Sequence, residues 1–491
     1  MKYGLPVTLS TLLLPAVFAA TAEQWRTRSI YQLITDRFAL PAGANRNACN
    51  VEDRTWCGGT WSTIRENLDY IQNAGFTAIW ISPINQNHEG ERPYWGDAYH
   101  GYWIADATQL NARFGTEDEL KALISEVHNR NMYIMIDVVV NNVMATSTTP
   151  DYSKYMFKDP SLYHPYCPIQ WGNPESEQNC WMGDDKVPLP DLDTNNPTVI
   201  ATYKTWIKDL VSKYNIDGLR IDAAKHVQAS FWPEFCASAG VFCMGEVFSS
   251  DVGGAAQYQG PLDSVLNFPM QNALVRAFSS SGEKNIGAIP SVLDESKQKF
   301  RDITVLGNFL ENQDMGRWAS FSSDMQTTHN AMTFNFMSDG IPVVYYGQEQ
   351  GFASASDPYN REPLWPSGYA LTYTYNITSQ LNQLRNHLIR NSDWLSSSVQ
   401  VLTTNEIGIA IKKGNAISVM TNIGSSPRND VRVTVQSPFS SSTTLTNIFT
   451  CEEFTVNSGA SFDITYGNGG QPAVLVPRDS LSGSGLCSAS I

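Results

Sequence analysis

Three carboxylic acids follow apolar, strand-like runs of the sequence and could share one site. The runs are IDGLRID (216–222), VFCMGEV (241–247) and VLGNFLEN (305–312). Asp222 ends the first run, Glu246 lies near the end of the second, and Asp314 comes two residues after the third. Arg220 precedes Asp222 by two residues and therefore shares its face of the strand. Because the carboxyl ends of parallel strands meet at one mouth, we expect these side chains to converge there.

Such a set of side chains suits the cleavage of a glycosidic bond. In the retaining mechanism one carboxylate attacks the anomeric carbon and a second carboxyl group protonates the leaving oxygen. The nucleophile must stay ionised, which a neighbouring Arg220 favours. The acid must keep its proton near neutral pH, which less polar surroundings achieve. A third carboxylate can bind sugar hydroxyls and stabilise the cationic transition state.

Apolar strand-like runs alternate with helical or polar segments along most of the chain. Besides the three above, the runs are SIYQLITDRF (29–38), FTAIWISPI (76–84), MYIMIDVVV (132–140) and IPVVYYG (341–347). The segment GTEDELKALISEVHNRN (115–131) has helical spacing, with acids early and a basic residue late. Nearly continuous apolar strands are typical of a parallel sheet that is buried on both faces. The pattern predicts an α/β fold, a (β/α)8 TIM barrel.

Two segments depart from this alternation. Residues 141–195 are rich in Pro, Asn, Asp and Trp, and a stretch this long predicts a small inserted domain after the third strand. From about residue 400 short alternating runs replace the helices, which predicts an antiparallel β-sandwich over 399–491. We therefore expect the barrel to comprise residues 23–140 and 196–398.

The composition limits the partners and the location of the protein. The 491 residues carry a formal net charge of −15, whereas nucleic acids and anionic membranes both need basic patches, so we expect neither as a partner. Residues 1–22 are typical of a signal peptide, with Lys2 before a short apolar run and small residues at its end. No later segment is apolar for about 20 residues, so we expect no membrane span. We expect a secreted, extracellular monomer.

The eight cysteines, an even number in an exported chain, predict disulfides. Proximity along the chain suggests the pairs Cys49–Cys57, Cys167–Cys180, Cys236–Cys243 and Cys451–Cys487. Zinc is the alternative, which the lack of a C-x2-C pair disfavours. The sequon at Asn376 predicts a glycosylation site at the surface.

Four segments, in order along the chain, resemble the signature segments of the α-amylase family. They are DVVVN (137–141), DGLRIDAAKH (217–226), GEV (245–247) and ENQD (311–314). Further segments are most similar to the secreted fungal α-amylases: TDRF (35–38), CGGTW (57–61), YHGYW (99–103), LPDLD (189–193), GQEQ (347–350) and NRE (360–362). The resemblance extends over residues 23–491 and implies a retaining enzyme that acts on α-1,4-linked glucans.

The resemblance implies a role for each matching residue. Asp222 would be the nucleophile, Glu246 the general acid/base, and Asp314 a ligand of the sugar in the cleavage subsite. The substrate contacts that it implies are Arg220, His100, Tyr102, Trp103, Asn142, Gln313, Lys225, His226, Asp357 and Arg361. Within this set Tyr102 would stack on the sugar, the pair Asp357 and Arg361 would bind on the donor side, and Lys225 and His226 would face the leaving group. Core packing is the alternative for Tyr102, and a surface salt bridge is the alternative for the donor-side pair.

The resemblance also implies a structural calcium where the inserted domain meets the barrel. Asn141, Asp191 and the backbone oxygen of His226 match three ligand positions. The fourth, which is often acidic in the family, is Gln178 here, with Glu177 adjacent. Because ligand charge increases calcium affinity, we expect a weakened calcium site.

Two positions depart from the family pattern. Asn142 and Gln313 stand where the family has histidines that hydrogen-bond the sugar being cleaved. Losing such donors weakens transition-state binding, so we expect weak hydrolysis of internal α-1,4 bonds in starch-like glucans and maltooligosaccharides. One alternative is a 4-α-glucanotransferase of cell-wall α-glucan metabolism, which would be associated with the cell wall. The other is a non-catalytic α-glucan-binding homologue, which the three retained carboxylates disfavour.

Overall fold

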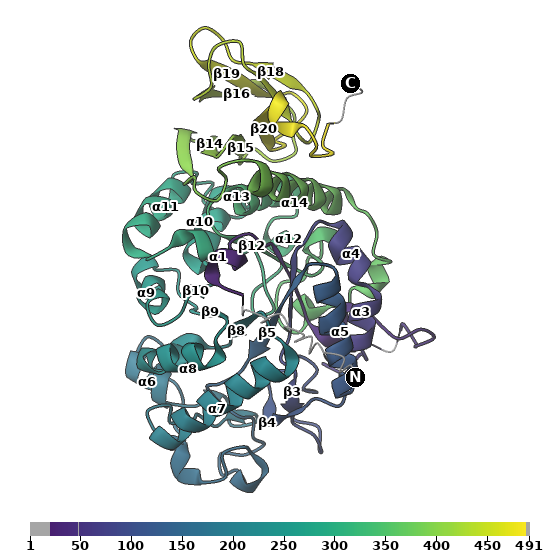
Figure 1. Ribbon diagram of the computed structural model, residues 1–491, viewed down its shortest axis with the longest axis vertical. Coiled ribbons are helices and arrows are strands. Elements are labelled where there is room, and N and C mark those ends of the chain that lie inside the picture. The colour runs from purple at the N-terminus through teal and green to yellow at the C-terminus, as the bar shows by residue number, and fades with distance from the viewer. Residues whose placement is uncertain (1–19, 48, 488–491) are drawn as a thin grey trace, which may run out of the picture.

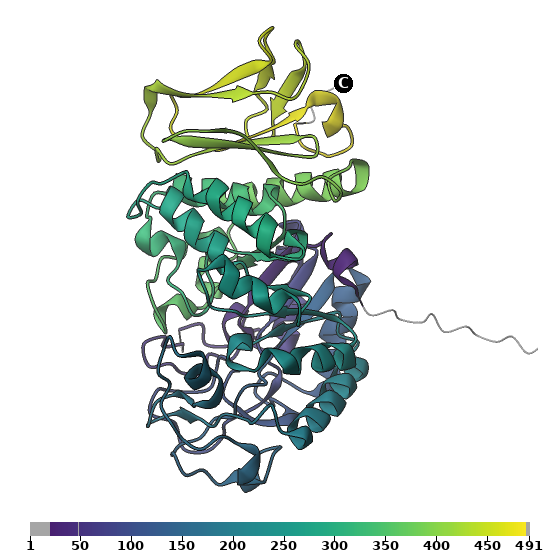
Figure 2. The same ribbon diagram turned by 90° about the vertical axis from the view of Figure 1, so that its left-hand side faces the viewer.

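The computed structural model describes residues 20–47 and 49–487, in which a helix-covered barrel carries a β-domain at one end (Figures 1 and 2). Residues 1–19 of the expected signal peptide lie outside the described residues. Within the described ranges, no helix has both the length and the apolar character that a membrane crossing requires.

Eight parallel strands form the barrel and confirm the predicted fold class. In spatial order they are β10 (Ser264–Val265), β9 (Phe242–Gly245), β8 (Gly218–Ile221), β5 (Tyr133–Val138), β2 (Ala78–Ile81), β1 (Ile30–Leu33), β12 (Ile341–Tyr345) and β11 (Gly307–Asn308). A parallel bridge between Leu266 and Gly307 joins the two ends of this order and closes the ring.

Both faces of the barrel strands are buried, as their apolar sequences require. One apolar cluster includes Ile30, Trp80, Met135, Met244 and Val343, which come from five strands and fill the barrel interior. The intervening residues pack outwards against the helices. These helices are α3 (Trp61–Glu66), α4 (Leu68–Asn73), α5 (Glu117–Asn129), α7 (Pro197–Tyr214), α8 (Trp232–Ala239), α9 (Val252–Ala256), α10 (Phe268–Phe278), α11 (Ala288–Lys299), α13 (Met325–Met337) and α14 (Tyr373–Asn391).

Several strands are shorter than the apolar runs that predicted them. The run 305–312 contains only the two residues of β11, and the equally short β10 has no apolar run long enough to reveal it. Within the run 29–38, strand β1 ends at Leu33, and the last four residues of the run form the short helix α2 (Thr35–Phe38). Two further short helices are α1 (Ala22–Trp25) and α12 (Trp318–Phe321).

The segment between β5 and α7 is folded into small elements. They are two turns of 3₁₀ helix (Tyr152–Lys154 and Pro160–Leu162), α6 (Pro174–Asn179), β6 (Met182–Gly183) and β7 (Pro188–Leu189). A hairpin of β3 (Asn85–Asn87) and β4 (Ile104–Leu110) follows β2. Both segments leave the barrel at the carboxyl ends of strands, so they build up the rim around its mouth.

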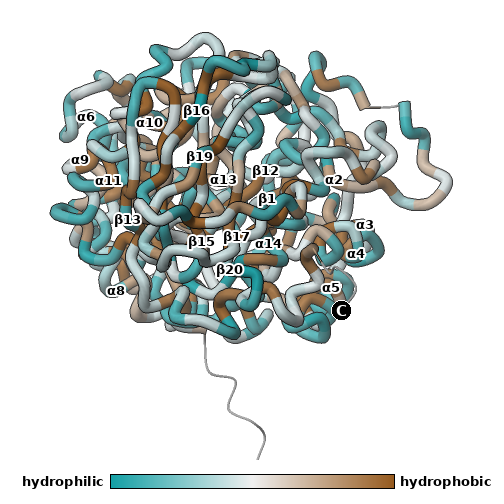
Figure 3. The backbone as a smooth tube through the Cα atoms, turned by 90° about the horizontal axis from the view of Figure 1, so that it is seen from above, coloured by the Kyte–Doolittle hydropathy of each residue, from teal (hydrophilic) through white to brown (hydrophobic). Residues whose placement is uncertain are grey.

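The C-terminal part is an antiparallel sandwich, as predicted. One sheet contains β13 (Gln400–Thr404), β14 (Gly408–Lys413), β15 (Ala416–Thr421), β20 (Ala473–Pro477), β17 (Thr444–Asn447) and β18 (Glu453–Thr455), and the other pairs β16 (Arg428–Gln436) with β19 (Ser461–Tyr466). An apolar cluster fills the space between them. In the view from above, these strands lie over α13 and α14 (Figure 3), and β15 packs on α13.

The structure contains three of the four predicted disulfides. Cys49–Cys57, Cys167–Cys180 and Cys451–Cys487 are bonded. The predicted bond between Cys236 and Cys243 is absent, because both are free thiols. Cys236 lies in α8 and Cys243 in β9, where its thiol donates to the carbonyl of Val241, 3.7 Å away. The predicted glycosylation residue, Asn376, is exposed on α14 rather than in a loop.

Candidate active site

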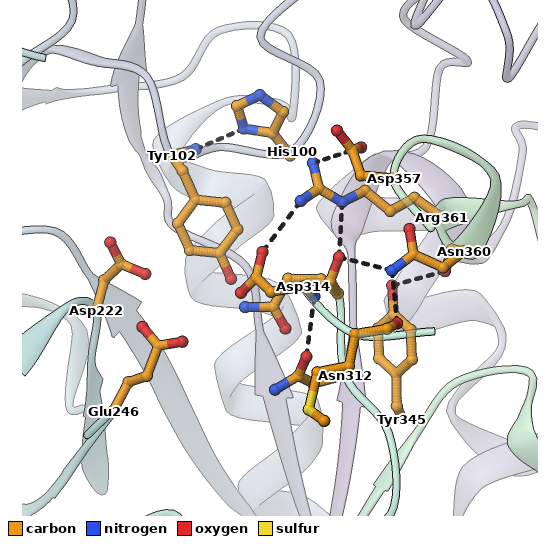
Figure 4. A network of polar contacts seen from close by, with 12 residues as sticks. His100, Tyr102, Asp222, Glu246, Asn312, Asp314, Tyr345, Asp357, Asn360 and Arg361 are labelled. Carbon is orange, nitrogen blue, oxygen red and sulfur yellow. Dashed lines mark hydrogen bonds and ion pairs between the residues drawn. The ribbon is translucent and has the colours of Figure 1, made fainter. Parts of the chain in front are cut away.

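The three carboxylates of the sequence prediction come together at the mouth of the barrel. Asp222 directly follows β8, Glu246 directly follows β9, and Asp314 lies in the loop after β11. Figure 4 shows Asp222 and Glu246 on neighbouring strands, with Asp314 and Tyr102 facing the same opening. The opening is a cavity of about 440 Å³, and its walls include Asp222, Asp314, His100, Tyr102, Trp103, Asp357 and Arg361.

One buried guanidinium links the acids at the base of this opening. Nη1 of Arg220 lies 2.8 Å from Oδ1 of Asp222 and 2.9 Å from Oδ1 of Asp137, while Nη2 lies 2.9 Å from Oε2 of Glu246. The backbone N–H of Ala223 also donates to Oε2 of Glu246, at 2.9 Å. Ala223 adopts a left-handed conformation with φ of 48°, an unusual geometry for alanine that is typical of functional sites.

The electrostatics of this group favour one shared proton. Burial raises the pKa of Asp222 and of Glu246 to about 7 each, Arg220 opposes the rise, and the other site carboxylates add to it. Burial likewise raises the pKa of Asp137 to about 6, against the same arginine. Two acids that share one cation do not both ionise easily, so at neutral pH the pair Asp222 and Glu246 readily holds one proton. One ionised and one protonated carboxyl group are what a retaining glycosidase needs.

Aromatic side chains form the wall next to the carboxylates. The hydroxyl of Tyr102 donates to Oδ2 of Asp137 at 2.8 Å, which fixes the orientation of its ring. The backbone N–H of Tyr102 donates to Nδ1 of His100 at 3.0 Å, and the two rings are stacked. Burial lowers the pKa of His100, with Arg361 and Arg37 contributing, so this histidine is neutral. A flat aromatic wall beside a polar floor is typical of a sugar subsite.

Arg361 connects two carboxylates at the other side of the cavity. Its guanidinium lies 3.1 Å from Oδ1 of Asp314 and 3.2 Å from Oδ1 of Asp357 (Figure 4). Arg54 also pairs with Asp357, at 3.7 Å, and its guanidinium lies over the ring of Trp95. These four polar side chains and the aromatic ring offer hydrogen bonds and a stacking surface to a neutral ligand with many hydroxyl groups.

Several residues of this wall were not predicted from the sequence, and they include three polar or aromatic side chains that could contact a sugar. Arg54, Trp95 and Asp184 all line the cavity, and the indole N–H of Trp95 donates to Oδ2 of Asp184 at 2.7 Å. Trp95 lies within GERPYWGD, a Gly- and Pro-containing loop with two exposed aromatic residues. Neighbouring aromatic residues in such a loop are the sequence feature that could have identified Trp95 as a candidate binding residue. Asp184 gave no comparable signal, because only the fold brings the inserted segment to this loop.

The residues that stand in place of the family's histidines are both buried. Among the described residues, the side-chain amide of Asn142 makes two long hydrogen bonds: its oxygen accepts from Nδ2 of Asn141 at 3.4 Å, and its nitrogen donates to the carbonyl of Val143 at 3.5 Å. Oε1 of Gln313 accepts a hydrogen bond from Nε2 of Gln32 at 2.6 Å. Neither amide can carry a positive charge, so both can offer only neutral hydrogen bonds to a ligand.

Lys225 and His226 are not part of the cavity wall; they lie where the inserted segment meets the barrel. Nζ of Lys225 pairs with Glu177 at 2.9 Å, and Nδ1 of His226 is 2.8 Å from the backbone oxygen of Glu177. The exposed ring of Trp171 packs edge-on against the ring of His226. Glu177 therefore ties this side of the mouth to the inserted segment.

The predicted calcium ligands lie near this junction, and their donor atoms suit a hard cation. Oδ1 of the buried Asp191 has no hydrogen-bond partner in the described part of the chain, while Oδ2 lies 2.6 Å from Nδ1 of His164. Asn141 lies beside Asp191, because the backbone oxygen of Asn141 accepts a hydrogen bond from the N–H of Leu192, the residue after Asp191. Burial raises the pKa of Tyr258, and a hydrogen bond with the Gln178 side chain opposes the rise. The described residues contain no group of three or more His, Cys, Asp or Glu that could hold a metal, so a cation here would depend on amide and carbonyl oxygens besides the carboxylate of Asp191.

Comparison with known families gives two matches that together span most of the chain. The model "Alpha amylase, catalytic domain" matches residues 15–363, and "Alpha-amylase, domain C" matches residues 401–491.

Comparison with individual proteins agrees. The chain is 40% identical over 479 residues to Alpha-amylase 2 of Schwanniomyces occidentalis, which covers 96% of this chain and 94% of that protein. It is 40% identical over 483 residues to the Alpha-amylase of Saccharomycopsis fibuligera, with 97% and 95% covered. The solved structure of an alpha-amylase from Malbranchea cinnamomea superposes with a TM-score of 0.92 at 39% identity, over 96% of this chain and all of that one.

Proposed function

The chain belongs to the α-amylase family, and from that membership we propose that it cleaves internal α-1,4-glucosidic bonds of starch-like glucans and maltooligosaccharides with retention. It is an enzyme of the α-amylase type. The observation that carries the proposal is the position of Arg220 between Asp222 and Glu246, with Asp314 facing the same cavity.

The geometry supports a two-step reaction. In the first step a carboxylate oxygen of Asp222 attacks the anomeric carbon, while Glu246 gives its proton to the departing glycosidic oxygen. In the second step Glu246 takes a proton from water, the hydroxide attacks the same carbon, and the bond to Asp222 breaks. Arg220 favours the ionised nucleophile by charge, and burial keeps the proton on Glu246.

The surrounding side chains hold the substrate. The ring of Tyr102, fixed by its bond to Asp137, supports one face of the sugar at the cleavage subsite, where His100, Trp103 and Asp314 offer further contacts. Arg361 and Asp357 bind the sugar units on the donor side. Lys225 and His226 bind on the leaving-group side, near the junction with the inserted segment.

Asn142 and Gln313 make hydrolysis weak in this proposal. Both reach the site as neutral amides, and a neutral donor makes a weaker hydrogen bond to a sugar hydroxyl than a cationic donor does. The sugar on Asp222 could also pass to another sugar instead of water. The comparisons do not favour 4-α-glucan transfer or a non-catalytic binding role over α-amylase activity.

Members of this family usually bind calcium, and the oxygen donors at the junction fit such an ion. Asn141, Asp191, Gln178 and the backbone oxygen of His226 would hold it, and the unpartnered Oδ1 of Asp191 is the donor that most needs a cation. The ion would supply positive charge that fixes the inserted segment to the barrel. Because Gln178 already contacts Tyr258 and is uncharged, the affinity would be modest.

The disulfides are consistent with an extracellular protein, and we place the enzyme outside the cell as a monomer with Asn376 glycosylated. We further propose that it is associated with the cell wall.

Replacement of the two reacting carboxyls tests the proposal. Asp222→Asn and Glu246→Gln should each lower the rate of maltoheptaose cleavage at least about 10³-fold, with unchanged thermal unfolding. Asp294→Asn and Glu234→Gln, at exposed positions on α11 and α8, are matched controls that should keep the full rate. If either active-site variant kept more than a tenth of the wild-type rate, its assigned role would be wrong.

A further inference from the structure

Gln32 is a polar side chain buried in the apolar interior of the barrel. It lies on β1, where it pairs with Tyr345 of β12 on one side and Trp80 of β2 on the other. It is two residues after Ile30, which belongs to the inner apolar cluster, so both side chains point inwards. Only 3% of Gln32 is exposed. A buried amide is costly unless it is hydrogen-bonded, so its partner indicates why it is there.

That partner is the side chain of Gln313, next to the site carboxylate Asp314. Nε2 of Gln32 donates to Oε1 of Gln313 at 2.6 Å. The backbone oxygen of Gln313 is also fixed, because it accepts from Nδ2 of Asn360 at 2.9 Å and from Nε of Arg361 at 3.0 Å. Within the described ranges, Nε2 of Gln313 donates to no residue of the chain. The bond from Gln32 therefore holds the oxygen end of this amide, while its nitrogen end has no partner among the described residues.

We propose that Gln32 is a positioning residue that fixes the rotation of the Gln313 amide and so presents its N–H groups to a hydroxyl of the sugar being cleaved. The inference rests on the proposed function. A terminal amide has two broad rotational states related by about 180°. With no donor at position 32, the Gln313 amide can turn and offer its oxygen to the sugar, which removes the donor from the site.

A double-mutant cycle tests whether Gln32 acts through Gln313. Gln32→Met keeps the length of the side chain and removes its donor, and Gln313→Met removes the proposed sugar contact. We expect Gln32→Met to lower kcat on maltotriosyl fluoride about 10- to 100-fold with KM within about twofold, by analogy with a lost transition-state donor. The double variant should be no slower than Gln313→Met, because the two changes remove the same interaction. Multiplied effects in the double variant would overturn the proposal.

A second variant gives a pH readout that a merely structural role would not produce. Gln32→Glu introduces a carboxyl group that donates to Oε1 of Gln313 when protonated and only accepts when ionised. The rate of this variant relative to wild type should therefore rise as the pH falls from 8 to 5. A ratio that stays low at every pH would contradict the proposal, even if Gln32→Met fails to fold.

The matched control is Gln259, another fully buried glutamine. Its Nε2 donates to the backbone oxygen of Asp302 at 2.6 Å, in the segment before β11, whereas the site loop follows β11. Gln259→Met should lower the melting temperature and leave kcat unchanged. The proposed function is tested independently. If Asp222→Asn is inactive but the effects of Gln32→Met and Gln313→Met are additive, only the role of Gln32 is wrong.

Discussion

Arg220 and Asp222, two residues apart on one strand end, form an ion pair of 2.8 Å at the base of the cavity. The same guanidinium reaches Asp137 and Glu246, so one cation controls the charge of three acids. A planar group with donors on both sides can do this, whereas a lysine ammonium is a compact point charge.

Arg220→Lys should therefore lower kcat/KM on maltoheptaose at least about 100-fold. Because Arg220 lowers the pKa of Asp222, a weaker partner raises it, and the ionised nucleophile then appears only at higher pH. The acidic limb of the pH profile should shift to higher pH by a measurable amount. Arg276→Lys, at an exposed pair with Glu283, is the control. An unchanged profile for Arg220→Lys would show that the arginine does not set the charge of Asp222.

The alkaline limb of the pH profile should report Glu246. Burial raises the pKa of Glu246 to about 7, so the proton that the reaction needs is present below about pH 7 and is lost as the pH rises. The rate on maltoheptaose should fall on that side. A fluoride leaving group needs little protonation, so the first turnover of Glu246→Gln on maltotriosyl fluoride, measured as released fluoride, should not fall between pH 7 and 9. A persisting alkaline limb in this variant would assign the proton to another group.

Removal of calcium should destabilise the protein through linked binding. We expect a chelator to lower the melting temperature of the wild-type protein by several degrees, and added calcium to restore it. Asp191→Asn should melt at the same temperature with and without calcium, whereas the control Asp294→Asn should respond like wild type. If the melting temperature of the wild-type protein changed with neither chelator nor added calcium, the proposed calcium site would be wrong.

Restoring histidine at the two departing positions should strengthen hydrolysis. The paired change Asn142→His and Gln313→His supplies imidazole donors that can make charge-assisted hydrogen bonds to hydroxyls of the cleaved sugar, and such contacts strengthen in the transition state. We expect reducing ends to be released from maltoheptaose at least about tenfold faster, with a lower proportion of products longer than the substrate. Chromatography of the products over a range of substrate concentrations measures both. No gain in the paired variant would mean that the amides are not what limits hydrolysis.

Local patterns in the sequence were sufficient for the architecture and for the reacting groups. Apolar runs without alternation predicted parallel strands, and polar residues at the ends of those runs identified Asp222 and Glu246. Strands as short as β10 and β11 have too few residues for such a pattern. Proximity along the chain predicted four disulfides, of which the structure contains three, and the prediction was wrong for Cys236 and Cys243, which are free thiols.

Contacts between distant segments could not be predicted in this way. Gln32 and Gln313 are 281 residues apart, and their hydrogen bond depends on β1 and the loop after β11 meeting in the closed barrel. The contact between Trp95 and Asp184 likewise joins the loop between β3 and β4 to the inserted segment. Sequence patterns give the face on which a side chain lies, whereas its partner depends on the tertiary structure.

The most direct test of the account is to detect a sugar bound covalently to Asp222. Glu246→Gln lacks the base that activates water, so it should accumulate the intermediate when mixed with maltotriosyl fluoride. Mass spectrometry of the denatured protein should show one added maltotriosyl group, and digestion should place it on the peptide that contains Asp222. The account predicts this adduct and its loss in the variant that also carries Asp222→Asn. An adduct on another residue, or cleavage that gives the inverted β-anomer without any adduct, would contradict it.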